Sequence, residues 1–416
     1  MQKSVLVIGG GAAGMMAALF AARANARVTL LERNEKTGKK IYITGKGRCN
    51  LTNACDREAF LRRVMRNPRF LYASLATLDS FATMALMDEL GLALKTERGD
   101  RVFPASDKAS DVTATLMREL ARLGVQVRLN ARARRVLTEG GRASGVQLET
   151  GERICADAVI LATGGLSYPS TGSTGDGHEM ASQTGHALIK PLPSLVPIET
   201  REDWPKALAG LSLKNVRLSA YMASGGKEKR IYSEQGEMLF THFGVSGPLV
   251  LTLSALLPED LSCVRMCIDL KPALDEKTLD ARLVRDLRDL SRKQLGTVMD
   301  GLAPHNLALA LLALANLSPA LAANAVTQAQ RRALVALFKA VPLTPAALRG
   351  FAEAVVTRGG VSVKDVNPST LESRRVPGLY FAGELLDLDA VTGGFNLQIA
   401  FSTGALAGKS AAGEEE

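Results

Sequence analysis

The sequence predicts an α/β protein whose main domain is built on a doubly wound, mostly parallel sheet. Short, largely apolar runs, typical of buried parallel strands, occur at residues 5–8, 28–31, 158–162 and 378–382. The first two runs are separated by a glycine-rich turn and an alanine-rich helical stretch, and the last two are each followed closely by glycine. Because such strands occur near both ends of the chain, we expect the two ends to form one sheet, with the middle inserted between them.

The first 32 residues have the order strand, glycine turn, helix, strand and acid that is typical of dinucleotide-binding folds. Gly9 permits a tight bend, Gly11 permits the backbone to approach a pyrophosphate, and Gly14 permits close helix–strand packing. The N-terminus of the following helix would face the phosphates. Glu32 ends the second strand, where its carboxylate can accept hydrogen bonds from the ribose hydroxyls of an adenosine. These residues predict a bound dinucleotide.

The same N-terminal segment superficially resembles a secretory signal, but three consecutive glycines interrupt the apolar helix that a signal needs. No other stretch reaches about 18 apolar residues without charge, so no membrane-spanning helix is expected. The five cysteines are spread over 416 residues and do not suggest a disulfide framework. We therefore expect a cytoplasmic protein with no membrane partner and no metal site, and the sequence leaves its oligomeric state open.

The composition limits the class of partner. A formal net charge of +9 suits nucleic acid, but it suits anionic cofactors and substrates equally well. One basic group lies in a loop rich in glycine and amide residues, which suits anion binding, and the other fits a solvated helix face. The first contains Lys36, Lys39, Lys40, Lys46 and Arg48, and the second contains Arg62, Arg63, Arg66 and Arg69. Because aromatic residues make up only 5% and no RNA-binding motif occurs, we expect a small-molecule substrate and no nucleic-acid partner.

The middle of the chain predicts two inserted segments that split the nucleotide domain into residues 1–190 and 371–416. Residues 191–274 contain short alternating runs broken by turn residues, which predict a β-rich insert. Residues 275–350 are rich in Ala and Leu at helical spacing, which predicts a helical insert. Residues 351–370 are expected to supply the return strands of the β insert.

The C-terminal segment is expected to return to the nucleotide domain, and binding of a flavin explains this return better than binding of a nicotinamide does. A buried flavin needs a second loop for its ribityl chain, and a helix N-terminus stabilises the negative charge that reduction places at N1 and C2=O. Gly383 and Glu384 supply such a loop, and Gly393 and Gly394 lead into the last helix with Asn396 beside the ring. Only one complete GxGxxG is present, so NAD(P)H would bind transiently as electron donor.

Five segments together carry a family resemblance: residues 45–53, 162–165, 172–177, 241–248 and 378–398. On these segments the chain resembles the BaiN-like flavoproteins, also called HI-type or YhiN-like, over nearly its whole length. The resemblance implies FAD in a Rossmann-type domain split by a β-barrel-like and a helical insert. It also implies reduction of a C=C bond conjugated to a ketone in a bile-acid or steroid-like 3-oxo substrate. The family label mentions aminoacetone oxidase as well.

The fingerprint and the family motifs together give a set of expected FAD-binding residues, in which Val136 is expected to contact the adenine through its backbone. The set is Gly9, Gly11, Ala12, Ala13, Gly14, Glu32, Arg33, Lys40, Gly45, Arg48, Cys49, Asn50, Val136, Thr163, Gly164, Gly383, Glu384, Gly394, Asn396 and Leu397. Cys49 has no partner at CxxC spacing, so we interpret it as a small residue packed against the flavin site.

Two residues are candidates for catalysis, Tyr168 and His242. An enone reductase needs a group that polarises the carbonyl and an acid that protonates the α-carbon, and both residues lie in loops expected near the cofactor. Their alternatives are structural: a histidine in a Gly/Ser turn and a tyrosine packed before a proline. Two other functions stay open, an amine oxidase that uses O2 and a flavin-containing RNA-modifying or RNA-binding protein.

Overall fold

The computed structural model describes residues 2–413 and divides into two compact units. Unit 1 comprises Met1–Ser194 and Gly350–Glu416, and unit 2 comprises Leu195–Arg349. The chain therefore leaves unit 1 after Ser194 and returns to it at Gly350.

Unit 1 is built on a five-stranded parallel sheet with the order β20-β10-β1-β2-β6. The strands are β1 (Ser4–Ile8), β2 (Arg27–Leu31), β6 (Gln126–Arg128), β10 (Ala158–Leu161) and β20 (Leu379–Phe381). Strands from both ends of the chain thus lie in one sheet, with β10 between β1 and β20. The predicted fold class is confirmed.

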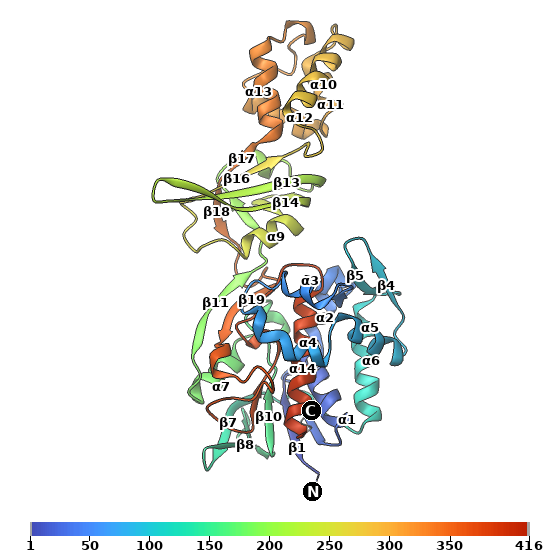
Figure 1. Cartoon of the computed structure of the whole chain (residues 1–416), viewed down its shortest axis with the longest axis vertical. Helices are drawn as coiled ribbons and strands as arrows, with labels where there is room; N and C mark the ends of the chain where they lie inside the picture. Colours follow the sequence, from blue (N-terminus) through green and yellow to red (C-terminus); the bar gives the residue numbers. More distant parts are fainter. Residues whose placement is uncertain (1, 414–416) are drawn as a thin grey trace. The chain divides into compact units, whose positions relative to one another are not determined.

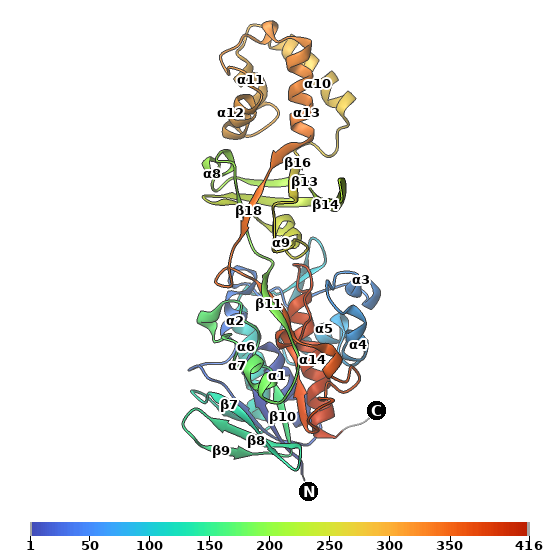
Figure 2. The ribbon, with the colours of Figure 1, turned by 90° about the vertical axis from the view of Figure 1, so that its left-hand side faces the viewer.

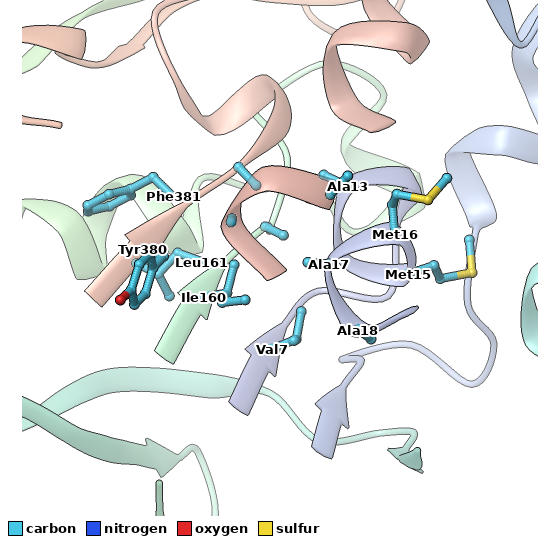
Figure 3. Close-up of a cluster of buried hydrophobic side chains, with 14 of the residues drawn as sticks. Val7, Ala13, Met15, Met16, Ala17, Ala18, Ile160, Leu161, Tyr380 and Phe381 are labelled. Carbon is cyan, nitrogen blue, oxygen red and sulfur yellow. The ribbon is translucent and has the colours of Figure 1, made fainter. Parts of the chain in front are cut away.

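Two helices, α1 (Ala12–Arg23) and α14 (Phe395–Ala412), pack side by side in the core of unit 1. Figure 3 shows helix α1, which carries Ala13, Ala17 and Ala18, next to the strands that carry Val7, Ile160 and Leu161. A Cβ atom on Gly404 or Gly408 would lie 2.3 Å from the carbonyl oxygen of Ala13 or Ala17, so the two backbones touch at these glycines. From this register, α14 begins about 12 Å before the start of α1. Its first two turns therefore project beyond the N-terminus of α1.

Smaller elements surround this core. Two three-stranded sheets have the orders β3-β5-β4 and β7-β8-β9, and β11 pairs with β19. These strands are β3 (Thr52–Asn53), β4 (Leu94–Glu97), β5 (Arg101–Pro104), β7 (Ala133–Glu139), β8 (Arg142–Leu148), β9 (Arg153–Cys155), β11 (Leu188–Ser194) and β19 (Val356–Val361). The helical segments are α2 (Lys39–Ile43), η1 (Thr44–Gly47), α3 (Arg57–Leu61), η2 (Pro68–Leu71), α4 (Tyr72–Thr77), α5 (Ser80–Glu89), α6 (Ala109–Arg122), η3 (Pro169–Thr171), α7 (Asp176–Gln183), η5 (Val363–Asp365) and η6 (Gly383–Leu385).

The stretch Pro68–Glu89 is long and apolar enough, by composition, to cross a membrane. It consists of η2, α4 and α5, and half of it is buried inside the protein. The side-chain amide of Gln398, on α14, donates to the Leu78 carbonyl at 3.0 Å and to the Thr83 hydroxyl at 2.8 Å. This stretch therefore packs on α14 as part of the core of unit 1.

Unit 2 contains a seven-stranded antiparallel sheet with the order β17-β16-β13-β14-β15-β12-β18. Its strands are β12 (Ile198–Thr200), β13 (Ser212–Ser224), β14 (Lys227–Thr241), β15 (Gly244–Ser246), β16 (Val264–Asp269), β17 (Val341–Leu343) and β18 (Pro345–Leu348). Its helical segments are α8 (Trp204–Ala207), α9 (Pro248–Ser254), α10 (Glu276–Asp289), α11 (Leu295–Asp300), α12 (His305–Leu314), η4 (Ala323–Ala325) and α13 (Gln328–Lys339). Helices α10 to α13 gather next to β16 and β17 (Figures 1 and 2). A β-rich and a helical segment are therefore both present.

The prediction that residues 351–370 rejoin the β insert is wrong. β19 pairs with β11 inside unit 1, and the returning strands are β17 and β18, directly after α13. Pro342 and Pro345 explain the error, because proline cannot donate to a ladder and its presence argues against a central strand. β17 and β18 are the two edge strands of the sheet, where proline is tolerated.

Candidate functional site

The turn between β1 and α1 contains two glycines that close packing requires, Gly9 and Gly14, and one glycine, Gly11, that packing does not require. Gly9 has a φ of +102°, and its N–H donates to the Leu31 carbonyl at 2.8 Å. A Cβ on Gly14 would lie 1.8 Å from the Gly9 carbonyl oxygen, so α1 lies directly on the turn. A Cβ on Gly11, in contrast, would meet nothing within 4 Å. Gly11 leaves open space beside the helix, as the close approach of a pyrophosphate requires.

The N-terminus of α1 has free hydrogen-bond donors. Gly11 is its N-cap and offers no side-chain cap, and the first turn contains no acidic residue. The first N–H groups of a helix have no intrahelical partner, so those of Ala12, Ala13 and Gly14 point toward an anion site. The residues present therefore fit a pyrophosphate here.

Glu32, at the end of β2, is buried and holds the turn in shape. Its Oε2 accepts a hydrogen bond from the Gly10 N–H at 2.8 Å, and its Oε1 accepts from the backbone N–H and the side-chain amide of Asn34 at 2.8 and 2.7 Å. Carboxylate oxygens accept more than one hydrogen bond each. Oε2 therefore keeps capacity for a ribose hydroxyl. Val136 is buried in β7, and the segment before β7 is tied to this point because the Ala131 N–H donates to the Glu32 carbonyl at 2.9 Å.

Arg33 is engaged with the loop before α7. Its guanidinium lies 3.0 Å from Asp176 and also bonds Thr174, while Arg132 makes two contacts of 2.8 and 2.9 Å with Asp176. Burial raises the pKa of Asp176, but the hydrogen bond with Arg132 and the charge of Arg33 lower it more. Arg33 therefore positions residues 172–176 beside the end of β2.

The loop of residues 44–50 contains four residues with positive φ, namely Gly45, Lys46, Gly47 and Cys49, at 57°, 59°, 87° and 60°. Cys49 is fully buried, and this burial raises the pKa of its thiol to about 12 although a hydrogen bond with Thr44 lowers it. The thiol is therefore neutral near pH 7 and unsuited to thiolate chemistry. This agrees with the interpretation of Cys49 as a packing residue.

Arg48 uses its guanidinium within the protein. It contacts Glu97 and Asp107 at 2.5 Å each and lies 4.2 Å from the centre of the Phe103 ring. The hydrogen bonds with Glu97 and Asp107 raise the pKa of Arg48 above its usual range. Arg48 therefore anchors the loop, and its side chain is not free to bind a phosphate.

Three polar atoms near the carboxyl edge of the sheet lack partners. Within residues 2–413, Asn50 Oδ1, Thr52 Oγ1 and Thr163 Oγ1 are buried and accept or donate no hydrogen bond. Thr163 and Gly164 follow β10, and Thr52 lies against Gly394, whose added Cβ would be 2.4 Å from the Thr52 carbonyl oxygen. Buried polar atoms are nearly always hydrogen-bonded. Their environment therefore suits a polar ligand such as FAD.

Lys40 and Glu384 meet in one partly buried cluster. The Lys40 ammonium pairs with Glu384 Oε2 at 2.5 Å, and Glu384 Oε1 accepts from the Ser167 hydroxyl at 2.5 Å and the Thr357 N–H at 2.9 Å. Burial raises the pKa of Glu384, but the charge of Lys40 and these hydrogen bonds lower it more. Sequence reasoning missed Ser167 and Thr357. The position of Ser167, four residues after Thr163 in the same strand-end loop, was an available signal.

Gly394, whose φ is +98°, occupies the N-cap position of α14 and offers no side-chain cap. Asn396 does not offer its side chain to a ligand: its Oδ1 accepts from the Ala390 N–H at 2.9 Å, and its amide donates to the Ala390 and Val391 carbonyls. The expected role of that side chain beside the flavin ring is therefore replaced by a role in folding the preceding loop. The main-chain N–H groups of Asn396 and Leu397 remain as donors.

The two catalytic candidates lie in different units. Tyr168, in unit 1, has a φ of 50°, and its N–H donates to the Phe351 carbonyl at 2.9 Å. Burial and the charge of Glu353 raise the pKa of its phenol. His242, in unit 2, is exposed in the turn between β14 and β15, and its ring centre lies 4.9 Å from that of Phe243. The contacts of each residue lie within its own unit and do not indicate a catalytic role.

Comparison with known proteins identifies the family. The family model described as HI0933-like protein Rossmann domain matches residues 3–410. The chain is 35% identical over 413 residues to the 3-dehydro-bile acid delta(4,6)-reductase of Clostridium scindens, covering 98% of both chains. It is 30% identical over 403 residues to the ribosomal RNA dihydrouridine synthase of Haemophilus influenzae, covering 96% of both.

Among solved structures, the chain is similar to the 3-ketosteroid-delta4-(5alpha)-dehydrogenase from Rhodococcus jostii RHA1 in complex with 4-androstene-3,17-dione. The TM-score is 0.54 at 17% identity, with 99% of this chain and 97% of the other covered, so the likeness concerns the fold. The match across nearly the whole sequence, together with the dinucleotide turn, shows that the chain belongs to the HI0933-like Rossmann family and is an FAD-dependent oxidoreductase.

Proposed function

We propose that the protein reduces a C=C bond conjugated to a carbonyl group. Support comes from the names of two relatives, a 3-dehydro-bile acid delta(4,6)-reductase and a ribosomal RNA dihydrouridine synthase. A double bond beside a 3-oxo group and the C5=C6 bond of uracil are both conjugated to a carbonyl. The same chemistry, hydride to the β-carbon and a proton to the α-carbon, reduces either one.

The observation that carries this proposal is the pair of uncapped helix N-termini at one edge of the parallel sheet. Neither α1 nor α14 has a side-chain cap, and the unpartnered polar atoms of Asn50, Thr52 and Thr163 belong to strand β3 and to the segments before β3 and after β10. FAD, when bound, supplies the hydride. In our proposal, α1 binds the pyrophosphate through its N–H groups, and α14 stabilises the negative charge at N1 and C2=O during reduction. Lys40 and Glu384 orient the connecting part of the cofactor.

We propose a small, largely apolar 3-oxo compound of the bile-acid or steroid class as the first candidate substrate, because the reductase relative has the higher identity. NAD(P)H is the proposed electron donor and binds transiently. The second candidate is a uracil base in RNA, favoured by the synthase relative and by the net charge of +9. No observation favours amine oxidation.

The test is anaerobic stopped-flow absorbance of the FAD-loaded protein, followed in the visible flavin band. NADH and NADPH are offered first. The reduced protein is then mixed with a conjugated 3-oxo steroid, its saturated analogue as control, or uridine-containing RNA. We expect bleaching by a nicotinamide and recovery with the conjugated steroid but not with its saturated analogue. Recovery with RNA alone would select the second candidate, and recovery with neither would contradict the proposed reaction.

A further inference from the structure

A buried carboxyl group, that of Asp389, lies outside the expected FAD-binding set. Asp389 belongs to residues 386–394, which connect η6 to α14 at the carboxyl edge of the sheet. Its side chain is 1% exposed. The Ser194 hydroxyl donates to its Oδ2 at 3.0 Å, whereas its Oδ1 has no hydrogen-bond partner among the described residues. One of the two oxygen atoms of this buried carboxyl group therefore lacks a hydrogen bond within the described part of the chain.

Charged side chains surround Asp389, but the Arg66 contact is not a short hydrogen bond to its carboxyl group. Arg66, after α3, places its Nε 3.8 Å from Asp389 Oδ1, and its Nη1 lies 3.6 Å from Asp387 Oδ1. Arg358 on β19 contributes a second positive charge, and Asp387 on the same connection contributes a negative one. Burial is the largest effect and raises the pKa of Asp389 to about 6, although Ser194, Arg66 and Arg358 lower it. The group therefore exchanges its proton near neutral pH.

The main chain around Asp389 is fixed on both sides. The Met65 N–H donates to the Asp389 carbonyl at 2.8 Å, and the Val391 N–H donates to the Arg63 carbonyl at 3.0 Å. The Asn396 side chain binds both the N–H and the carbonyl of Ala390. Asp389 therefore stays buried in its ionised form, at a cost in stability. Titratable groups held in this way are typical of functional sites.

We propose that Asp389 is the proton-exchanging residue that supplies the proton for reduction of the conjugated C=C bond, with Arg66 and Arg358 compensating the carboxylate that remains. This inference rests on the proposed function. In that reaction the hydride forms one C–H bond at the β-carbon. The C=C π bond breaks, and its electron pair forms the C–H bond at the α-carbon with a proton released by the Ser194 hydroxyl. Asp389 passes its own proton to Ser194 Oγ and keeps the electron pair of its O–H bond as the carboxylate. Solvent then returns a proton to Asp389.

Because Asp389 is buried, it acts through its neighbours and is a positioning residue for the proton. Ser194 is the neighbour that bonds it directly. When Asp389 is ionised, the Ser194 hydroxyl donates to it. When Asp389 is protonated, its own O–H can donate to Ser194 Oγ, which frees the serine hydroxyl to donate elsewhere. Protonation thus reverses one hydrogen bond at the end of β11.

Carbon-13 NMR of the aspartate carboxyls in the full-length protein tests the titration without FAD. We expect one carboxyl that titrates at a pKa of about 6 and is absent in Asp389→Asn. The control Asp365→Asn should keep this titration, because Asp365 is paired with Arg375 at 2.8 Å and its pKa is lowered by that bond. Ser194→Ala should move the titration to higher pH, since the lost hydrogen bond favours the ionised form. Absence of this titration would overturn the inference.

The second readout is the pH profile of flavin reoxidation by the substrate in a single turnover. Asp389→Asn should slow reoxidation at least tenfold and remove the change in slope of the rate–pH profile near the pKa of Asp389. Asp389→Glu should restore this change in slope. An unchanged pH profile in Asp389→Asn would overturn the inference while leaving the proposed function in place. Failure of the wild-type protein to be reoxidised by either substrate would instead overturn the proposed function.

Discussion

Glu384 and Asp389 are carboxyl groups in one connection between β20 and α14, yet their pKa values move in opposite directions. Glu384 accepts hydrogen bonds from Lys40, Ser167 and Thr357, and its pKa is lowered despite burial. Asp389 accepts one hydrogen bond, from Ser194, and burial raises its pKa. The difference teaches that the positive charge of Lys40, together with three hydrogen bonds, outweighs burial at Glu384, whereas the more deeply buried Asp389, with one hydrogen bond, keeps its proton to higher pH.

The largest expected effect comes from removing the cation beside Glu384. Lys40→Met leaves Glu384 without its charged partner, and we expect the free energy of unfolding at neutral pH to fall by about 3 kcal/mol. Urea denaturation measures this loss. The control is Lys39→Met, because Lys39 pairs with the exposed Glu35 and should cost less than about 1 kcal/mol. Equal small losses for both variants would mean that Glu384 does not depend on Lys40.

The second prediction concerns the charge on Asp389. The folded-state pKa of about 6 lies above the ordinary value, so the native state binds the proton more tightly. Stability therefore falls as pH rises from about 4 to about 6. Asp389→Asn removes this penalty, and we expect it to raise the free energy of unfolding by about 2 kcal/mol at about pH 8, with a smaller effect at about pH 4. Denaturation at both pH values checks this, and destabilisation at the higher pH would contradict it.

A smaller effect of opposite sign is expected for Glu384. Its pKa is lowered in the folded state, so its contribution to stability is complete above its ordinary pKa and is lost as pH falls through the folded-state value. Glu384→Gln should weaken the fall of the free energy of unfolding toward acid pH. It should also reduce that free energy at neutral pH by about 1 kcal/mol. Unfolding curves collected between neutral and acid pH would show the change in slope. If stability falls toward acid pH as steeply in Glu384→Gln as in the wild type, this would contradict the pairing of ionised Glu384 with Lys40.

The smallest effect on stability is expected at Gly11, where internal contacts play no part. A Cβ there meets nothing within 4 Å, so Gly11→Ala should change the free energy of unfolding without FAD by less than about 0.5 kcal/mol. The same methyl group would stand in the space expected for the pyrophosphate, and FAD affinity should fall about tenfold, or about 1.4 kcal/mol. Fluorescence titration with FAD measures this affinity. An unchanged affinity for FAD would contradict the placement of the pyrophosphate beside Gly11.

Much of unit 1 could be predicted from the sequence, because most of its buried parallel strands are short, largely apolar runs and some of its glycines occupy positions set by close packing. Gly9 and Gly14 are examples in which local geometry alone dictates the residue. The return of the chain through β17 and β18 could not be predicted, since Pro342 and Pro345 conceal edge strands. Strand pairing of this kind depends on contacts that are distant in sequence.

For the candidate site, the sequence indicates which residues to consider, but the interactions of their side chains depend on the fold. Lys40 and Glu384 were both named from the sequence, but their pairing with Ser167 and Thr357 joins four separate segments. Arg48 and Asn396 were expected to face the ligand, whereas their side chains bond Glu97, Asp107 and Ala390. Asp389 was not singled out, because its chemistry arises from burial and from Ser194 and Arg66, which are far away in the sequence.

The most direct test of the central claim is a crystal structure of the protein with FAD bound. We expect the pyrophosphate at the N–H groups of Ala12 and Ala13, and the flavin ring at the N-terminus of α14. The ring should lie on the side of the connection that carries Asp389. Electron density for FAD away from this edge of the sheet, or a ring remote from α14, would contradict the account.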